Sequence, residues 1–91
     1  MLKVTERAKE HLRELLLANA NNPDTGLRLT ISRGGQLGVL LDREVPGDCI
    51  LEQGGLKLLL LGPELLPLVE GATLDIEQEQ SSARLVISKR G

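Results

Sequence analysis

The 91-residue sequence contains no phenylalanine, tyrosine or tryptophan. It therefore lacks the aromatic surfaces on which proteins usually stack single-stranded nucleic acid. Its formal net charge of −2 gives no general attraction to nucleic acid or to an anionic membrane surface. We expect neither kind of partner. A hydrophobic core has to be built from aliphatic side chains, above all from the 21 leucines.

Cysteine and histidine are almost as scarce, since Cys49 and His11 occur once each. A single cysteine excludes an internal disulfide and any C-x-x-C metal site. One chain also cannot supply the several soft ligands that a metal site of its own would require. The sequence therefore predicts no bound cofactor, and His11 is expected at the surface or at its boundary.

Two interpretations of Cys49 stay open. In the apolar segment that it begins, a single cysteine is typical of a small core residue. Alternatively it is a redox thiol, or a weak candidate metal ligand shared across a dimer. That role needs thiolate character, and no basic residue is adjacent in the sequence to lower the pKa of the thiol.

Long apolar runs are also missing. None approaches the roughly 18 residues that a membrane-spanning helix needs. The segment Met1–Val4 does not lead into the apolar region of a signal peptide. We expect one soluble, cytoplasmic domain over residues 1–91, because this length is typical of a single small domain.

The most informative segment runs from Gly26 to Gly38. Apolar and polar side chains alternate strictly from Leu27 to Ser32, which is the period of a half-buried strand. Three glycines then occupy five positions and predict a tight, exposed loop. The candidate binding loop consists of Gly34, Gly35, Gln36, Leu37 and Gly38. Gln36 either binds a partner or small ligand through its amide, or is a polar loop residue that favours solubility.

The rest of the chain predicts short strands in hairpin order and two helices, one after the first strand and a short one before the last two strands. The nearly all-apolar run Leu56–Leu61 predicts a strand covered on both faces. The expected helices are Glu6–Ala20, with Thr5 as N-cap, and a short one starting at Gly62-Pro63 and followed by Gly71. The other expected strands are Leu2–Val4, Val39–Val45, Cys49–Glu52, Thr73–Glu77 and Arg84–Ser88.

Apolar positions within these elements predict the core. The side chains expected to be buried are Leu12, Leu15, Leu29, Ile31, Leu58, Leu60, Leu74 and Ile76. Leu37, Leu40 and Leu41 exceed what one strand face can bury, so some of them should face solvent and support self-association. Asp75, Glu77 and Glu79 share a strand face, which is either a hard-cation site or a solvated surface near Arg84 and Lys89.

The motifs Gly26-Leu27-Arg28-Leu29 and Gly34-Gly35-Gln36-Leu37-Gly38 resemble the A-type iron–sulfur carrier (HesB/IscA-like) family, which reads G-L-R-L and then G-G-C-S-G. The segments Val4–Ala8, Asp48–Leu58 and Glu64–Ile76 are similar to further blocks of that family, in the same order. The resemblance implies an α+β, mainly β fold. It would be a pseudo-barrel of small mixed, largely antiparallel sheets with one N-terminal helix and one short helix.

The sequence departs from the family at its ligand positions. Gln36 stands where the loop cysteine is expected, and the given sequence ends at Gly91 without the family's C-x-C pair. Iron–sulfur clusters are held by thiolates, and a glutamine amide is neutral. The resemblance therefore implies a divergent, non-catalytic adaptor or regulatory protein that binds protein partners of iron–sulfur cluster assembly or sulfur metabolism and forms a homo-oligomer. The alternative is a residual iron or iron–sulfur carrier that uses Cys49 across an oligomer.

Overall fold

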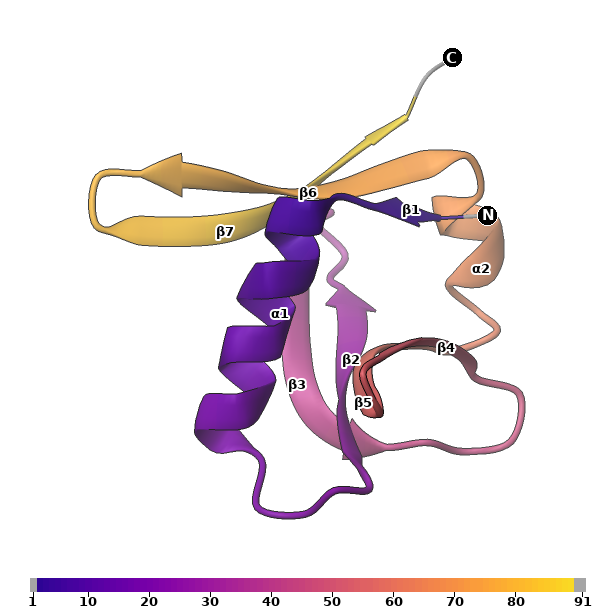
Figure 1. Ribbon diagram of the computed structural model, residues 1–91. Coiled ribbons are helices and arrows are strands. Elements are labelled where there is room, and N and C mark those ends of the chain that lie inside the picture. Colours follow the sequence, from indigo (N-terminus) through magenta and orange to yellow (C-terminus); the bar gives the residue numbers. More distant parts are fainter. Residues whose placement is uncertain (1, 90–91) are drawn as a thin grey trace.

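The computed structural model describes residues 2–89 and arranges them as two sheets with a long helix beside them (Figure 1). The elements run in the order β1 (Lys3–Val4), α1 (Glu6–Asn19), β2 (Thr25–Ile31), β3 (Leu37–Arg43), β4 (Cys49–Gln53), β5 (Leu56–Leu61), α2 (Leu66–Val69), β6 (Ala72–Glu79) and β7 (Ser82–Lys89). Met1, Arg90 and Gly91 lie outside the described residues, and so does the chain end at which the sequence lacks a C-x-C pair.

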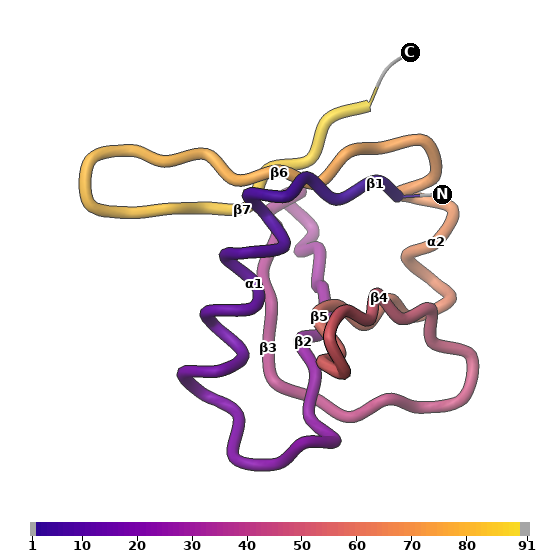
Figure 2. The backbone as a smooth tube through the Cα atoms, viewed as in Figure 1, coloured from indigo at the N-terminus to yellow at the C-terminus, as the bar shows by residue number. Residues whose placement is uncertain are grey.

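The two sheets are open and mixed. The smaller sheet has the order β1-β6-β7, and the larger one has the order β3-β2-β5-β4. Two neighbouring pairs are parallel, β1 with β6 and β2 with β5, and the other three pairs are antiparallel. Figure 2 shows β1 beside β6, although the two strands lie near opposite ends of the chain. The expected fold of small mixed, largely antiparallel sheets with one N-terminal and one short helix is confirmed.

Helix α1 begins where the sequence predicts it. The Thr5 hydroxyl accepts a hydrogen bond from the Ala8 N–H at 3.2 Å, and it donates one to the Asp75 carboxylate of β6 at 2.7 Å. The same hydroxyl therefore caps the helix start and joins it to the smaller sheet. Ala8, Leu12 and Leu16 recur at the helical period and are buried.

Strand β5 lies at the centre of the hydrophobic core. Its last four side chains, Leu58 to Leu61, are all buried, as expected for a strand covered on both faces. The largest group of buried side chains in contact consists of Leu12, Leu16, Leu27, Leu29, Leu58, Leu59, Leu61, Leu65 and Leu74. The core thus joins α1, both sheets and the segment before α2.

Five of the eight predicted core residues are buried, while Leu15, Ile31 and Ile76 are half-buried. Leu15 lies beside the stripe that α1 buries, and Ile31 is the last residue of β2 before the loop. Ile76 is the last residue of β6 before the exposed stretch Glu77–Glu79. Periodicity places each side chain on the inner face, but the core covers only part of that face.

Helix α2 differs from the expectation. It is four residues long and starts at Leu66, not at Gly62-Pro63. A helix through Pro63 would require Pro67 to donate to the Pro63 carbonyl, and proline has no N–H. Pro67 instead lies in the first turn of the observed helix, where no such donor is needed. Gly71 follows with φ +75°, as expected for a residue just beyond a helix end.

We predict that Leu58→Ala lowers the free energy of unfolding by about 2–5 kcal/mol, because the cavity in a closed aliphatic core cannot collapse fully. Urea unfolding followed by circular dichroism measures this, since the chain has no tryptophan or tyrosine. Leu17→Ala is the matched control on an exposed position of α1 and should change stability by less than about 0.5 kcal/mol. Equal losses in the two variants would contradict the assignment of the core.

Candidate functional site

The glycine loop is the tip of the β2–β3 hairpin, and its backbone is tightly folded. The Ser32 carbonyl accepts from the Gly35 N–H at 2.9 Å, and the Ser32 N–H donates to the Gln36 carbonyl at 2.9 Å. The Gln36 N–H donates to the Ser32 hydroxyl at 3.2 Å. Gly35 has φ +80°, a conformation that glycine adopts without steric cost. The loop therefore holds the Gln36 side chain at a defined, exposed position.

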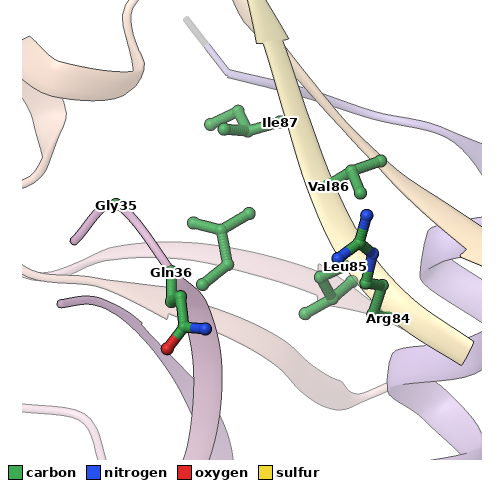
Figure 3. A pocket seen from close by; sticks show the side chains of 7 residues that line it. Gly35, Gln36, Arg84, Leu85, Val86 and Ile87 are labelled. Atoms are coloured by element: carbon green, nitrogen blue, oxygen red, sulfur yellow. The ribbon is translucent and has the colours of Figure 1, made fainter.

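A pocket of about 510 Å³ separates this loop from β7 (Figure 3). This volume lies within the range of about 300–1,000 Å³ that is usual for ligand sites. The loop side consists of Gly35, Gln36 and Leu37, and the opposite side consists of the four consecutive residues Arg84–Ile87. Successive residues of a strand point to opposite faces, so β7 lines the pocket with its edge.

Both strands at this pocket are terminal strands. β7 ends the smaller sheet and β3 ends the larger one. The outer edge of a terminal strand presents backbone N–H and C=O groups that no neighbouring strand of the sheet uses. The pocket therefore lies where the free edges of the two sheets face each other.

The chemistry of the pocket is polar but close to neutral. Gln36 contributes a carboxamide, while Leu37, Leu85, Val86 and Ile87 contribute apolar surface. The Arg84 guanidinium forms an ion pair with Glu77 of β6 at 3.0 Å and lies 3.8 Å from Glu79. Its charge is thus compensated from outside the pocket. None of the lining residues is a cysteine, a histidine or a carboxylate.

The five residues of the predicted binding loop do not all reach this pocket. Gly35, Gln36 and Leu37 line it, whereas Gly34 and Gly38 do not. Gly34 is exposed, and Gly38 belongs to β3, where a side chain would meet the Thr30 hydroxyl at 3.2 Å. Ligand binding by the loop stays a prediction.

Cys49 lies away from the loop. It is the first residue of β4, half-buried and free, and it lines a second pocket between the sheets. His11 lines a shallow cleft between α1 and the β6–β7 hairpin. Within residues 2–89, no three histidine, cysteine or acidic side chains gather in a way that could hold a metal ion.

The acidic residues of β6 are engaged in ion pairs. Glu77 pairs with Arg84, as expected for a solvated face, and Asp75 accepts from Thr5 and Arg7. Lys89 was expected beside this acidic face, but the register of β7 places it opposite Ala72, at the other end of β6. The hydroxyl of Thr5, then the Ile76 N–H and Arg7, lower the pKa of Asp75 to about 2.

The sequence did not predict the ion pairs of Arg28. Its guanidinium donates to both oxygens of Asp48 at 2.9 and 2.7 Å, to Asp42 at 2.5 Å and to the Arg43 carbonyl at 3.1 Å. The Asp48 side chain has no exposed surface, and it also accepts from the Val45 N–H at 2.8 Å. These bonds tie β3 and the following connection back to β2.

The same bonds fix the charge states. The Arg28 hydrogen bond and then the Val45 N–H lower the pKa of Asp48 from 3.8 to about 2. Arg28 and the Arg43 N–H lower the pKa of Asp42, and the two carboxylates raise the pKa of Arg28. The only signal in the sequence was a charged residue in a half-buried strand, because the partners lie 14 and 20 positions away.

The fold and the loop define a small α+β domain whose β2–β3 hairpin ends in an exposed glycine loop, and relatives of this kind are known. The chain is 35% identical over 78 residues to protein HesB from Leptolyngbya boryana, an alignment covering 79% of this chain and 64% of HesB. It is 30% identical to the iron–sulfur cluster insertion protein ErpA from Enterobacter sp. (strain 638), covering 96% of this chain and 79% of ErpA. The sequence matches no protein-family model.

A solved structure agrees with these sequence relatives. Escherichia coli SufA, described as involved in the biosynthesis of iron–sulfur clusters, superposes with a TM-score of 0.71 at 26% identity. That match covers 97% of this chain and 84% of SufA. The chain belongs to the A-type iron–sulfur carrier (HesB/IscA-like) family. It spans less than two thirds of the length of HesB. In the part of the chain that the structure describes, no helix is long and apolar enough to cross a membrane.

We predict that the Arg28–Asp48 pair makes stability depend on pH. Because folding lowers the pKa of Asp48 from 3.8 to about 2, its contribution is fully present above about pH 4 and is lost as the pH falls towards 2. Asp48→Asn should unfold at lower urea concentration at pH 7, and its stability should fall less between pH 4 and pH 2.

The matched control is Asp24→Asn, at an exposed aspartate in the turn before β2. It should follow the wild-type curve throughout. Part of the acid dependence should persist in Asp48→Asn, because Asp75 also has a lowered pKa. If wild type and Asp48→Asn lose stability in parallel below pH 4, the ion pair does not contribute as described.

Proposed function

We propose that this protein is a non-catalytic adaptor or regulatory member of the A-type iron–sulfur carrier family that does not itself hold a cluster. The observation that carries the proposal is Gln36, at the tip of the loop where the family places its ligand cysteine. The relatives named above act in iron–sulfur cluster insertion and biosynthesis according to their descriptions. We assign this protein to the same process through its protein contacts.

The donor set at the loop supports this proposal. A cluster is held by thiolate sulfur, as a rule from four cysteines. The pocket offers instead a neutral carboxamide, aliphatic side chains and the guanidinium of Arg84. A guanidinium is always protonated and has no lone pair to give to iron. The residues that line the pocket therefore do not fit an iron–sulfur cluster.

The form of the pocket supports a protein as the partner. An extended segment of another chain can add to a free sheet edge by main-chain hydrogen bonds. Here the edges of β3 and β7 both border the pocket, and Gln36 can donate and accept at its rim. We propose that partners from iron–sulfur assembly or sulfur metabolism dock at this position.

The alternative is a residual iron or iron–sulfur carrier that uses Cys49 across an oligomer. One observation favours it: Cys49 is free and half-buried on β4, which is also a terminal strand. Two copies that meet along β4 would bring two thiols together. We further propose a single cytoplasmic domain over residues 1–91 that contacts neither nucleic acid nor membrane.

We predict that the purified protein is colourless and takes up no stoichiometric iron or sulfide. Anaerobic reconstitution with ferrous iron and sulfide, followed by visible absorption and metal analysis, measures this. About two iron atoms per dimer, absent in Cys49→Ser, would overturn the adaptor proposal and support the alternative.

Gln36→Cys is the matched variant in the same experiment. We expect that it restores no stable cluster, because a dimer then gains two loop thiolates where a cluster commonly needs four. A strong visible band from Gln36→Cys in a Cys49→Ser background would show that the loop site is competent without further ligands.

Self-association next to the loop is a separate part of the proposal. Leu40 and Leu41 of β3 are 47% and 41% exposed, whereas Leu37 is half-buried at the pocket. Both exposed leucines lie on a terminal strand, so a second copy can cover them while pairing with the edge of β3.

We therefore predict a homo-oligomer in light scattering at tens of micromolar, and a smaller species for Leu40→Asp. Leu68→Asp, at an exposed leucine on α2, is the control and should keep the wild-type mass. A wild-type monomer would refute association through β3.

A further inference from the structure

A second pocket, separate from the glycine loop, lies between the two sheets and has a volume of about 270 Å³. It is enclosed by β1, β4, β5 and α2. Its lining consists of Leu2, Val4, Cys49, Ile50, Leu51, Leu59, Leu61, Leu66, Val69 and Glu70. We infer that this inter-sheet pocket binds a small, neutral, apolar molecule about the size of two fused aromatic rings.

The floor of the inter-sheet pocket follows from strand register. Cys49 lies opposite Leu61, and Leu51 lies opposite Leu59, in the antiparallel pair of β4 and β5. Paired residues point to the same face of a sheet, so these four side chains form one continuous surface. Leu59 and Leu61 belong to the core, and Cys49 and Leu51 pack against it.

The opposite wall comes from β1 and α2. Leu2 directly precedes β1, Val4 is the second residue of β1, and Val69 is the buried residue of α2. Helix α1 fills the space between the sheets on one side, and its apolar residues belong to the core. The hollow lies on the side of β4 and α2, where Cys49, Leu66 and Val69 are among the described residues that line it.

The chemistry of the lining defines the occupant. Eight of the ten lining residues are leucine, isoleucine or valine, and the other two contribute one thiol and one carboxylate. Among the described residues that line it, none is a lysine or arginine that could bind an anion. An anion would lose its hydration there without gaining a partner. The pocket therefore disfavours an anionic ligand, and its aliphatic lining favours an apolar one.

The volume defines its size. A closed aliphatic cavity of about 150 Å³ stays dry and binds benzene. The inter-sheet pocket is larger, at about 270 Å³, and suits a second fused ring or an alkyl chain of similar bulk.

A second copy of this chain is a poor occupant. The sequence has no phenylalanine, tyrosine or tryptophan, so its exposed apolar side chains are leucines and a valine. A leucine side chain has four carbon atoms, fewer than half of the ten in two fused aromatic rings, so one such side chain would leave much of the hollow empty. A ring system of the proposed size fills it.

The experiment uses naphthalene as a neutral probe and 2-naphthoate as its charged counterpart. Because the protein has no aromatic residue except His11, saturation-transfer NMR from its methyl groups to the probe is nearly free of overlapping protein signals. We expect saturable binding of naphthalene, and affinity for 2-naphthoate lower by about tenfold or more, the cost of about 1.4 kcal/mol.

The variant Leu51→Phe places a ring inside the inter-sheet pocket and should weaken naphthalene binding by about tenfold or more. Leu68→Phe makes the same change on the exposed face of α2, outside the pocket, and should bind as wild type does. Bound naphthalene should also slow the alkylation of Cys49 by iodoacetamide, a readout that needs no variant because Cys49 is the only thiol.

Three results would overturn the inference. The first is no saturable binding together with an unchanged rate of Cys49 alkylation. The second is equal binding of naphthalene and 2-naphthoate. The third is a change of molecular mass in Leu51→Phe with unchanged naphthalene binding, which would assign this surface to a contact between copies.

Discussion

Burial of the leucines of β5 is the constraint on which the other elements depend, because a chain without aromatic residues has few other ways to build a core. Leu58 to Leu61 are covered on both faces, so both sheets and α1 must be placed around this strand. Gly26 of β2 lies close against the backbone of β5. A Cβ atom there would lie 2.8 Å from the Lys57 carbonyl, which no side chain can accept without moving the strands apart.

Two sets of polar contacts fix the elements around this core. The Asp75 carboxylate of β6 accepts a hydrogen bond from the hydroxyl of the N-cap Thr5 and so holds the start of α1 against the smaller sheet. Arg28 joins β2 to Asp42 of β3 and to Asp48 before β4. The hairpin that ends in Gln36 is thus held from its base, and its tip faces β7 across the 510 Å³ pocket. The leucine core positions the two sheets, and the ion pairs of Arg28 fix the β2–β3 hairpin within the larger sheet.

This architecture separates the glycine loop from the single thiol. Gln36 borders the pocket between the two sheet edges, whereas Cys49 lies in the floor of the inter-sheet pocket. The family scaffold therefore carries two pockets of different chemistry, and we propose a separate occupant for each. The first presents an amide and backbone edges, which suit a protein segment. The second is aliphatic and suits a neutral apolar molecule.

The sequence by itself determined the elements whose side chains follow a local period. The alternation from Leu27 to Ser32, the stripe Ala8-Leu12-Leu16 and the N-cap Thr5 all predicted what the structure contains. The G-L-R-L and glycine-loop motifs also indicated the family. The start of α2 was wrong, because the missing N–H of Pro67 outweighed the preference of Pro63 for a helix start. Three of the eight predicted core residues are also only half-buried.

Only the tertiary structure decided which distant residues meet. Arg84–Ile87 line the loop pocket because β7 is a terminal strand, and strand order cannot be derived from periodicity. Arg28 was placed on the polar face of its strand, but its partners Asp42 and Asp48 follow from the path of the chain after β3. Local sequence patterns predict which face of a strand or helix a side chain occupies. Which groups share that face depends on how the sheets pack.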